Sequence, residues 1–332
     1  MTDHALLAPW IRRFLLEHLV AERNLARNTQ TTYRDCLTQL LPFVARAVRR
    51  DVDRLLVEDL SAAHVRAFLD HLERDRGCAV LTRNHRLAAI HSLARFIGMH
   101  SPEHVAWCAQ VRSVSFKKAA KTIIGYLEKP EVDALLRVPD RRVALGARDH
   151  ALLLFLYNSG ARADEAASLQ VGNLQLGTSP SVRILGKGNK WRACPLWPKT
   201  ADILRPLVAS RSAEDPVFRG RTGVALTRFG VHRIVVACAT MAAKNLTSMR
   251  GKRISPHTLR HTAAVHLLRS GVDINTIRAW LGHVSLDTTH VYAEVDLEMK
   301  AKALASVDIT GLPLSRPRGK TVPSVMDFMR QL

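Results

Sequence analysis

One segment of this chain is patterned as a β-hairpin, while the sequence around it repeats with the period of an α-helix. Residues 181–185 (SVRIL) and 191–196 (WRACPL) form two short runs on either side of GKGNK. A Gly-rich turn between two such runs is typical of a β-hairpin. The preceding segments KPEVDALLRV and ALGARDHALLLFLYNSG indicate helices, the latter ending at Gly160. These patterns predict a mainly α fold with a small antiparallel β-sheet in the C-terminal part.

The first hundred residues carry helical patterns throughout. Asn28 or Thr29 can cap one helix and Ser61 can cap AAHVRAFLDHLER, because such side chains accept a hydrogen bond from the first turn. Two more helices are expected near residues 5–20 and 81–98, which makes about four in all. The helix after Ser61 carries one apolar stripe, formed by Val65, Phe68, Leu69 and Leu72. We therefore expect an N-terminal four-helix bundle.

The length of 332 residues is enough for roughly two domains, each with its own core. We expect a helical domain over residues 1–110, a basic linker over 111–124, a mixed domain over 125–310 and a tail over 311–332. The segment QVRSVSFKKAAKT lacks a long apolar period and is rich in Lys and Arg. A linker of this kind can lie against phosphates.

The chain is strongly basic, with 49 Lys and Arg against 29 Asp and Glu, a formal net charge of +20. Such an excess favours a polyanionic partner, and nucleic acid is the commonest one. A basic soluble protein without such a partner is the alternative.

The sequence has no signal for a membrane or an oxidising compartment. The five cysteines are scattered, without a C-x-x-C pair, which suits a reducing cytosol and weakens a structural zinc site. The first residues, MTDHALLAPWIRRF, have no signal-peptide core, and the longest apolar run, ALLLFLY, is too short to cross a bilayer. We expect a cytoplasmic protein.

The segment SPHTLRHTAAVHLLRSG, residues 255–271, places two basic side chains at the start of a helix. Ser255 is a good N-cap and Pro256 a good first-turn residue. His257 and Arg260 are three residues apart and so lie on one face. The N–H groups and partial positive charge of that helix end favour a bound phosphate. A capping histidine beside a solvated arginine is the alternative.

A metal site at this helix is the less favoured interpretation. His257 and His261 have the i, i+4 spacing of zinc ligands, but a zinc protease would have Glu where this chain has Thr258. No nearby carboxylate replaces that glutamate. We expect neither a metal nor another cofactor.

Two further candidate side chains follow this helix. Asp273 begins another short helix, and Gly282 ends it beside His283. A third helix from near Ser285 would present Tyr292 one or two turns later. A lone tyrosine in such a place is commonly a half-buried core ring.

Taken together, PHTLRHTAAVHLLRSGVDINTIRAWLGHVSLDTTHVY resembles the C-terminal signature of the tyrosine recombinase (phage integrase) family, with Xer-type and transposon-borne members the nearest. That signature has His-x-x-Arg, then Leu-Gly-His, then a nucleophilic Tyr nine residues beyond that His. In this chain the matching residues are His257, Arg260, His283 and Tyr292.

Three segments upstream carry the same resemblance. NSGARADEAASLQVGNL is similar to the family's first-arginine box, with Arg162 and Glu165 at matching positions. VRILGKGNKWRACPL is similar to its catalytic hairpin, in which Lys187 matches the general-acid lysine and Lys190 is the alternative. RNTQTTYRDCLTQLLPF is similar to its N-terminal DNA-clamping domain. The resemblance implies a two-domain DNA clamp, with a helical core-binding domain and an α/β catalytic domain.

The resemblance also implies a phosphoryl transfer without metal or ATP. Tyr292 would attack a DNA phosphodiester, forming a 3′-phosphotyrosine and freeing a 5′-hydroxyl. Arg162 and Arg260 would hold the charge that develops on the phosphate, and Lys187 would protonate the departing oxygen. The other matched residues would exchange a proton with Tyr292 or the phosphate (His257), bond a phosphate oxygen (His283) and orient basic side chains (Glu165).

The implied partner is a double-stranded DNA recombination site. The implied assembly is a homo-tetramer in the synapse, or a hetero-tetramer with a related recombinase. Two rival functions remain: a type IB topoisomerase-like enzyme that reseals one strand, and a DNA-binding regulator or accessory protein that has the fold but cleaves nothing.

The tail ends in PSVMDFMRQL, which would form an apolar stripe if it were helical. Such a stripe needs a partner surface. The resemblance implies docking into a neighbouring protomer, and folding back on its own domain is the alternative. The stripe consists of Val325, Phe328, Met329 and Leu332.

Overall fold

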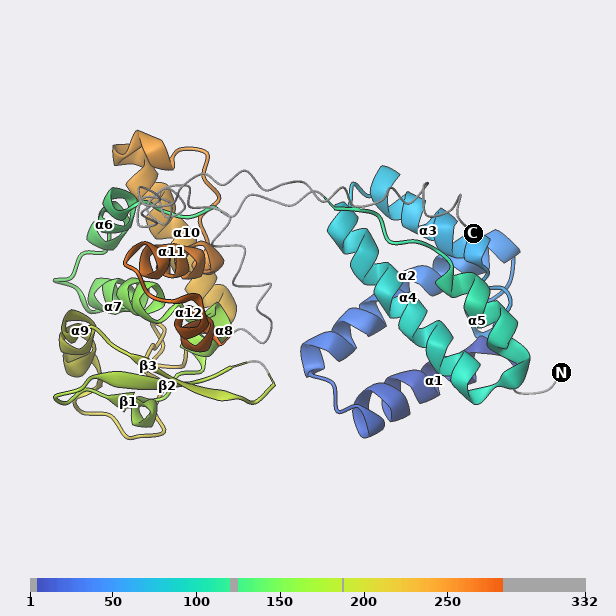
Figure 1. The fold of residues 1–332 in the computed structure, drawn as a ribbon, viewed down its shortest axis with the longest axis horizontal. Helices are drawn as coiled ribbons and strands as arrows, with labels where there is room; N and C mark the ends of the chain where they lie inside the picture. The colour runs from blue at the N-terminus through green and yellow to red at the C-terminus, as the bar shows by residue number, and fades with distance from the viewer. Residues whose placement is uncertain (1–4, 120–124, 187, 283–332) are drawn as a thin grey trace, which may run out of the picture. The chain divides into compact units, whose positions relative to one another are not determined.

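The computed structural model describes residues 5–119, 125–186 and 188–282. The chain divides into two compact units, residues 1–122 and 123–332, and each is described by itself (Figure 1). The described part of the first unit is helical, and that of the second combines helices with a small antiparallel sheet. The predicted mainly α fold with a small sheet is therefore confirmed.

The first unit contains one helix more than the sequence patterns indicated, α5, which follows closely after α4. Short 3-10 turns lie at Val52–Arg54 and Pro102–His104. The longer elements are α1 (Leu7–Arg13), which continues into a π-helical stretch (Phe14–Glu22), α2 (Arg27–Val48), α3 (Ala62–Arg74), α4 (Val80–His100) and α5 (Val105–Arg112).

Of the N-cap residues predicted for two helices of the first unit, one is confirmed and the other is wrong. The Ser61 side chain accepts from the His64 main-chain N–H at 3.2 Å, so α3 begins where its cap predicts. For α2 the prediction of Asn28 or Thr29 was wrong, because the Thr29 N–H already donates to the Ala26 carbonyl at 2.8 Å. Ala26 is thus the N-cap, without a side-chain bond.

The segment after α5 remains attached to the first unit. Trp107 and Val111 of α5, and Val114 beyond it, are buried in the core of that unit. Arg83 then donates to the Ser115 carbonyl at 2.9 Å. The Asn84 side chain donates to the Lys117 carbonyl at 2.8 Å and accepts from its N–H at 3.1 Å. The first residues of the basic linker segment are therefore held by α4.

The second unit surrounds one buried helix, α7. Helix α7 packs against α9 and α11. Helix α10 packs against α6 and α8, and helix α12 packs against β3. The elements are α6 (Lys129–Arg137), α7 (Ala144–Ser159), α8 (Ala163–Ala167), β1 (Leu174–Gln175), β2 (Ser181–Leu185), β3 (Trp191–Pro195), α9 (Pro198–Val208), α10 (Arg228–Asn245), α11 (Pro256–Arg269) and α12 (Ile274–Leu281).

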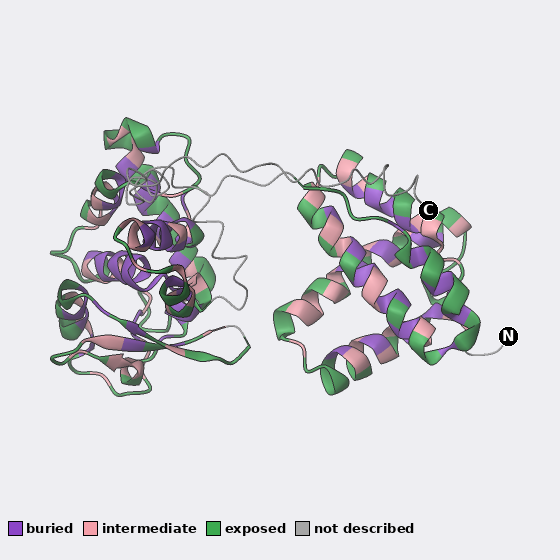
Figure 2. Ribbon diagram, viewed as in Figure 1, coloured by how far each residue is buried: buried purple, intermediate pink, exposed green. Residues whose placement is uncertain are grey.

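The apolar character of α7 on all sides explains its central place. Every residue from His150 to Ser159 is buried (Figure 2), as expected for a helix that is covered on all faces. None of the helices in the described ranges combines the length and the apolar character that a membrane span requires.

Within the described residues, the sheet has the strand order β1-β2-β3, with antiparallel pairs throughout. Val182 pairs with Cys194, and both are fully buried in the hydrophobic core of this unit. Gly188 and Asn189 in the turn between β2 and β3 have φ of 76° and 61°. The predicted hairpin is therefore present, with strands at residues 181–185 and 191–195.

Candidate active site

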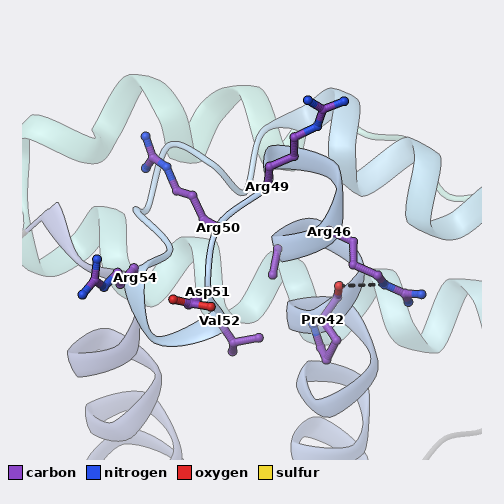
Figure 3. A pocket seen from close by; sticks show the side chains of 8 residues that line it. Pro42, Arg46, Arg49, Arg50, Asp51, Val52 and Arg54 are labelled. Atoms are coloured by element: carbon purple, nitrogen blue, oxygen red, sulfur yellow. Dashed lines mark hydrogen bonds between the residues drawn. The ribbon is translucent and has the colours of Figure 1, made fainter.

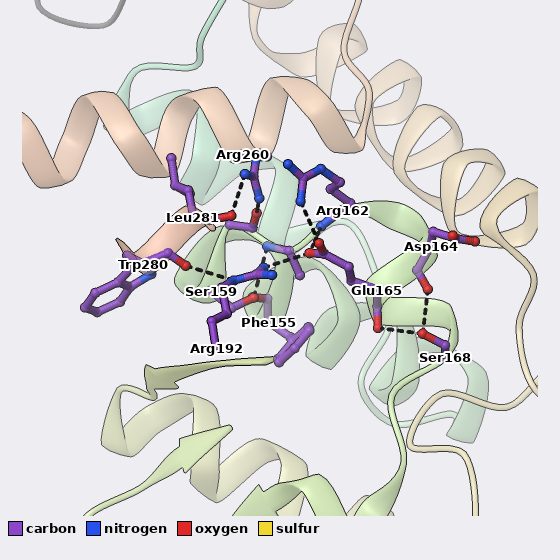
Figure 4. A network of polar contacts seen from close by, with 12 residues as sticks. Phe155, Ser159, Arg162, Asp164, Glu165, Ser168, Arg192, Arg260, Trp280 and Leu281 are labelled. Atoms are coloured by element: carbon purple, nitrogen blue, oxygen red, sulfur yellow. Dashed lines mark hydrogen bonds and ion pairs between the residues drawn. The ribbon is translucent and has the colours of Figure 1, made fainter. Parts of the chain in front are cut away.

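Arg162 is positioned by the sharp turn between α7 and α8. Gly160 ends α7 in the left-handed region, with φ of 59°, and Arg162 is the N-cap residue of α8. Glu165 accepts from the Arg162 main-chain N–H through Oε2 at 2.9 Å and from Nη1 through Oε1 at 2.7 Å (Figure 4). One carboxylate therefore fixes both the start of α8 and the Arg162 guanidinium.

A second arginine, Arg192 of β3, binds the same carboxylate. Its Nη2 donates to Glu165 Oε2 at 2.7 Å, and its Nε donates to the Trp280 carbonyl at 3.0 Å. Sequence reasoning gave Arg192 no role. The sequence feature that could have identified Arg192 is its position two residues before the buried Cys194. This spacing puts both side chains on the inner face of the strand. An arginine on a buried face needs an acidic partner, and that partner is Glu165.

The ionisation of Glu165 follows from these contacts. Burial alone would raise its pKa, but the hydrogen bonds and charge of Arg192, together with those of Arg162, lower the pKa of Glu165 to about 2. The carboxylate is therefore ionised at neutral pH and acts as a fixed acceptor between two guanidinium groups.

Arg260, on the buried side of α11, joins the ends of two other helices. Ser255 caps α11 by accepting from the Thr258 N–H, and Arg260 lies in the second turn, only 3% exposed. Its Nη1 donates to the Gly160 carbonyl at 2.6 Å and its Nη2 to the Leu281 carbonyl at 2.6 Å. These carbonyls end α7 and α12, so Arg260 lies beside the turn that carries Arg162 (Figure 4).

His257 lies in the first turn of α11, exposed, and within the electrostatic reach of both arginines. Partial enclosure by the protein, and then the charges of Arg260 and Arg162, lower the pKa of His257, which Glu165 opposes. The ring of His261 lies one turn on, with centroids 6.1 Å apart. Burial, His257 and Arg260 lower the pKa of His261 to about 4. Both imidazoles are therefore neutral at pH 7.

The structure thus brings together Arg162, Glu165, Arg260 and His257 among the residues selected from sequence. The other three, Lys187, His283 and Tyr292, lie outside the described residues. Lys190, the alternative to Lys187, is exposed, and its carbonyl accepts from the Gly186 N–H at 2.8 Å at the base of the hairpin turn.

Helix α12 is followed in the chain by Gly282 and then by His283. Asp273 caps this helix by accepting from the N–H groups of Asn275 and Thr276, as its sequence predicts. Gly282 follows in the left-handed region, with φ of 67°, and a Cβ there would lie 3.0 Å from Cδ of Arg192. A larger residue at 282 would therefore be strained and would displace Arg192.

Residues 5–119, 125–186 and 188–282 contain no group of three or more His, Cys, Asp or Glu side chains that could hold a metal ion. His257 and His261 thus have no third ligand of these types among the described side chains. All five cysteines are free thiols.

The first unit adds a basic groove that sequence reasoning did not identify. Its volume is about 790 Å³, and it lies at the C-terminal end of α2 and in the loop that follows (Figure 3). Arg50 pairs with Asp59 at 2.9 Å, and Arg46 donates to the Pro42 carbonyl at 3.2 Å. Four exposed arginines line the groove: Arg46, Arg49, Arg50 and Arg54. Such a concentration of guanidinium groups favours phosphate.

Comparison with known proteins gives the family. The profile of the Phage integrase family matches residues 125–299, and that of the phage integrase N-terminal SAM-like domain matches residues 11–98. A putative integrase/recombinase, y4rC, of Sinorhizobium fredii is 40% identical over 307 residues, 92% of each chain. Tyrosine recombinase XerC of Pelobacter propionicus is 32% identical over 87% of this chain and 91% of that protein.

Solved structures share the fold. XerH site-specific recombinase bound to a difH substrate has a TM-score of 0.64 at 21% identity, covering 86% of this chain and 81% of that one. The Tn1549 transposon integrase in complex with transposon right-end DNA has a TM-score of 0.66 at 12% identity, covering 89% and 98%. With both family profiles matched in order and close relatives along nearly the whole length, the chain belongs to the phage integrase family and is a tyrosine recombinase.

Proposed function

We propose that this recombinase cuts and rejoins DNA at specific sites through a 3′-phosphotyrosine intermediate on Tyr292. The observation that carries the proposal is the convergence of Arg162 and Arg260 on one turn, beside a neutral His257. Two guanidinium groups held by the protein suit a phosphate whose charge increases during reaction.

The Tyr292 oxygen attacks the scissile phosphorus and loses its proton, while the bond from phosphorus to the 5′ oxygen breaks. A phenol has a pKa near 10, so forming the phenolate at pH 7 costs about 4 kcal/mol without help from the site. His257, neutral because its pKa is lowered, can accept that proton. Lys187 protonates the departing 5′ oxygen, and His283 bonds a phosphate oxygen.

The positive charge in this site comes from the chain itself. Arg162, Arg260 and Lys187 take the part that metal ions take in other phosphoryl-transfer sites. The two arginines are held by different groups. The Glu165 carboxylate accepts from Arg162, and main-chain carbonyls accept from Arg260. We expect the reaction to need neither metal nor ATP, since the phosphotyrosine bond retains the energy of the broken phosphodiester.

The proposed partner is a double-stranded recombination site, clamped by the helical domain (residues 1–110) and the catalytic domain (125–310) with the linker 111–124 between them. The net charge of +20 and the arginines of the groove on the first unit support phosphate contacts by both parts. We expect a homo-tetramer in the synapse, or a hetero-tetramer with a related recombinase, with the tail 311–332 docking between protomers.

The experiment that tests this function maps where the purified protein protects and cleaves DNA flanking its own locus. A positive site is then placed on two differently labelled duplexes, and exchanged products are measured. Exchange supports recombination, whereas nicking and resealing without exchange indicates the topoisomerase-like rival. Protection without cleavage indicates a DNA-binding regulator.

A further inference from the structure

Arg192, whose side chain is largely enclosed, links three separate parts of the candidate site. Its side chain is 8% exposed, and that of its partner Glu165 is 5% exposed. Through Glu165 it reaches Arg162 at the start of α8, and through its Nε it reaches the Trp280 carbonyl at the end of α12. Figure 4 shows this guanidinium between Glu165 and the Trp280 carbonyl.

Two arginines hold consecutive carbonyls at the end of α12. Arg192 donates to the carbonyl of Trp280, and Arg260 donates to the carbonyl of Leu281. The last carbonyls of a helix lack partners within the helix and carry its partial negative charge. Guanidinium groups from β3 and α11 satisfy them here, immediately before Gly282 and the segment that begins with His283.

Arg192 also lies against Gly186, the residue that precedes Lys187 in the chain. A Cβ on Gly186 would lie 3.3 Å from Nη1 of Arg192 and 3.4 Å from Oε1 of Glu165. The Gly186 backbone therefore packs directly against the ion pair. Residue 187 is next in the chain, so the same pair limits where the hairpin turn can begin.

We propose that Arg192 is a positioning residue for DNA strand cleavage. It aligns Arg162 through Glu165, holds the end of α12 ahead of His283 and supports the hairpin ahead of Lys187. This inference rests on the proposed function, because those residues matter only if the chain cleaves DNA. In this role Arg192 acts through Glu165, the Trp280 carbonyl and Gly186, and not by binding the phosphate.

The test uses the full-length chain with Arg192→Gln and Arg192→Lys. Lysine keeps the charge but lacks the planar fork that donates to Glu165 and to the Trp280 carbonyl together. Arg205→Gln is the matched control, because Arg205 also donates to a carboxylate, Asp202 at 2.8 Å, and to a carbonyl, Leu176 at 2.9 Å. That pair is exposed and lies on α9.

Each protein is mixed with a saturating nicked duplex carrying its own site, and covalent adduct is followed in time. The rate constant of adduct formation reports how well the catalytic groups are aligned. The final amplitude reports the fraction of protein that is able to form the adduct. Misplacement of catalytic groups by about 1 Å costs on the order of 10²-fold in rate. We expect a loss of that order for Arg192→Gln at full amplitude and unchanged Kd, a smaller loss for Arg192→Lys, and none for Arg205→Gln.

Two results would overturn the inference by itself. An unchanged rate constant in Arg192→Gln removes any positioning role. A reduced amplitude with an unchanged rate constant shows that Arg192 serves only folding. If the Gln variant does not fold, the Lys variant is judged by the same two quantities. Absence of adduct with the unsubstituted protein would instead overturn the proposed function, and the inference with it.

Discussion

Arg162 and Glu165 are joined twice, by the main-chain N–H of the arginine at 2.9 Å and by its Nη1 at 2.7 Å. Because Arg192 binds the same carboxylate at 2.7 Å, Glu165 lies between two guanidinium groups in a buried site. Its charge is therefore a requirement for keeping both arginines in place. This relationship makes the stability of the second unit depend on pH.

Glu165→Gln should remove part of the acid sensitivity of folding. The pKa of Glu165 falls from 4.5 to about 2 on folding. A lowered pKa in the folded state contributes stability above the unfolded value of 4.5, and that contribution is lost as pH falls toward 2. A shift of this size corresponds to about 3 kcal/mol. Urea unfolding of both proteins from pH 6 to pH 3 should show the difference between them shrinking as pH falls.

Asp202→Asn is the control for that series, since Asp202 forms an exposed pair with Arg205. Exposed pairs contribute about 0–1 kcal/mol, so this variant should follow the unsubstituted protein. A difference between Glu165→Gln and the unsubstituted protein that stays constant with pH would contradict the assigned ionisation.

DNA binding should depend steeply on salt. If both units contact phosphates, log affinity falls with log salt concentration with a slope of about −0.9 per phosphate neutralised. Removing the first unit, residues 1–122, should lower both the affinity and the slope. Fluorescence anisotropy with a labelled duplex measures both quantities. Full affinity in the truncated protein would show that the first unit does not clamp DNA.

Cleavage should survive excess EDTA. Arg162, Arg260 and Lys187 supply the positive charge in the proposed site, so chelation removes nothing that the step uses. Adduct formation is measured with and without chelator, after dialysis against it. Activity that disappears and returns on adding magnesium or zinc would mean that the arginine pair is not sufficient.

Deleting residues 321–332 should separate cleavage from assembly. If the apolar stripe of the tail docks into a neighbouring protomer, the head-to-tail contact closes a ring, and its loss reduces synapsis and recombination. Single-site binding should be unchanged. Recombination by the shortened protein at the original rate would refute docking in trans, and loss of folding would favour the intramolecular alternative.

Sequence predicted those parts of the fold that depend on neighbouring residues. Ser61, Ser255 and Asp273 each cap a helix from their own side chains, and Gly160 ends α7 in the left-handed conformation that its position indicated. The hairpin also forms from local alternation and turn chemistry. The start of α2 differed, because Ala26 caps it through the main chain alone.

The parts that sequence did not predict depend on contacts between distant residues. The Arg192 contacts join residues 165, 192 and 280, and local periodicity carries no information about such a triad. Helix α5 was missed because its place depends on burial of Trp107 and Val111 against the rest of the first unit. Arg162, Glu165, His257 and Arg260 were selected by motif, while their mutual arrangement required the fold.

The most direct test of the central proposal is Tyr292→Phe on a nicked suicide duplex, resolved on a denaturing gel. The unsubstituted protein should accumulate a covalent protein–DNA adduct. The Phe variant should bind with the same affinity, because one hydroxyl adds little to many phosphate contacts, and should form no adduct. Tyr126→Phe, which removes a hydroxyl that accepts from Arg269, should react like the unsubstituted protein. A persistent adduct in Tyr292→Phe would contradict Tyr292 as the nucleophile.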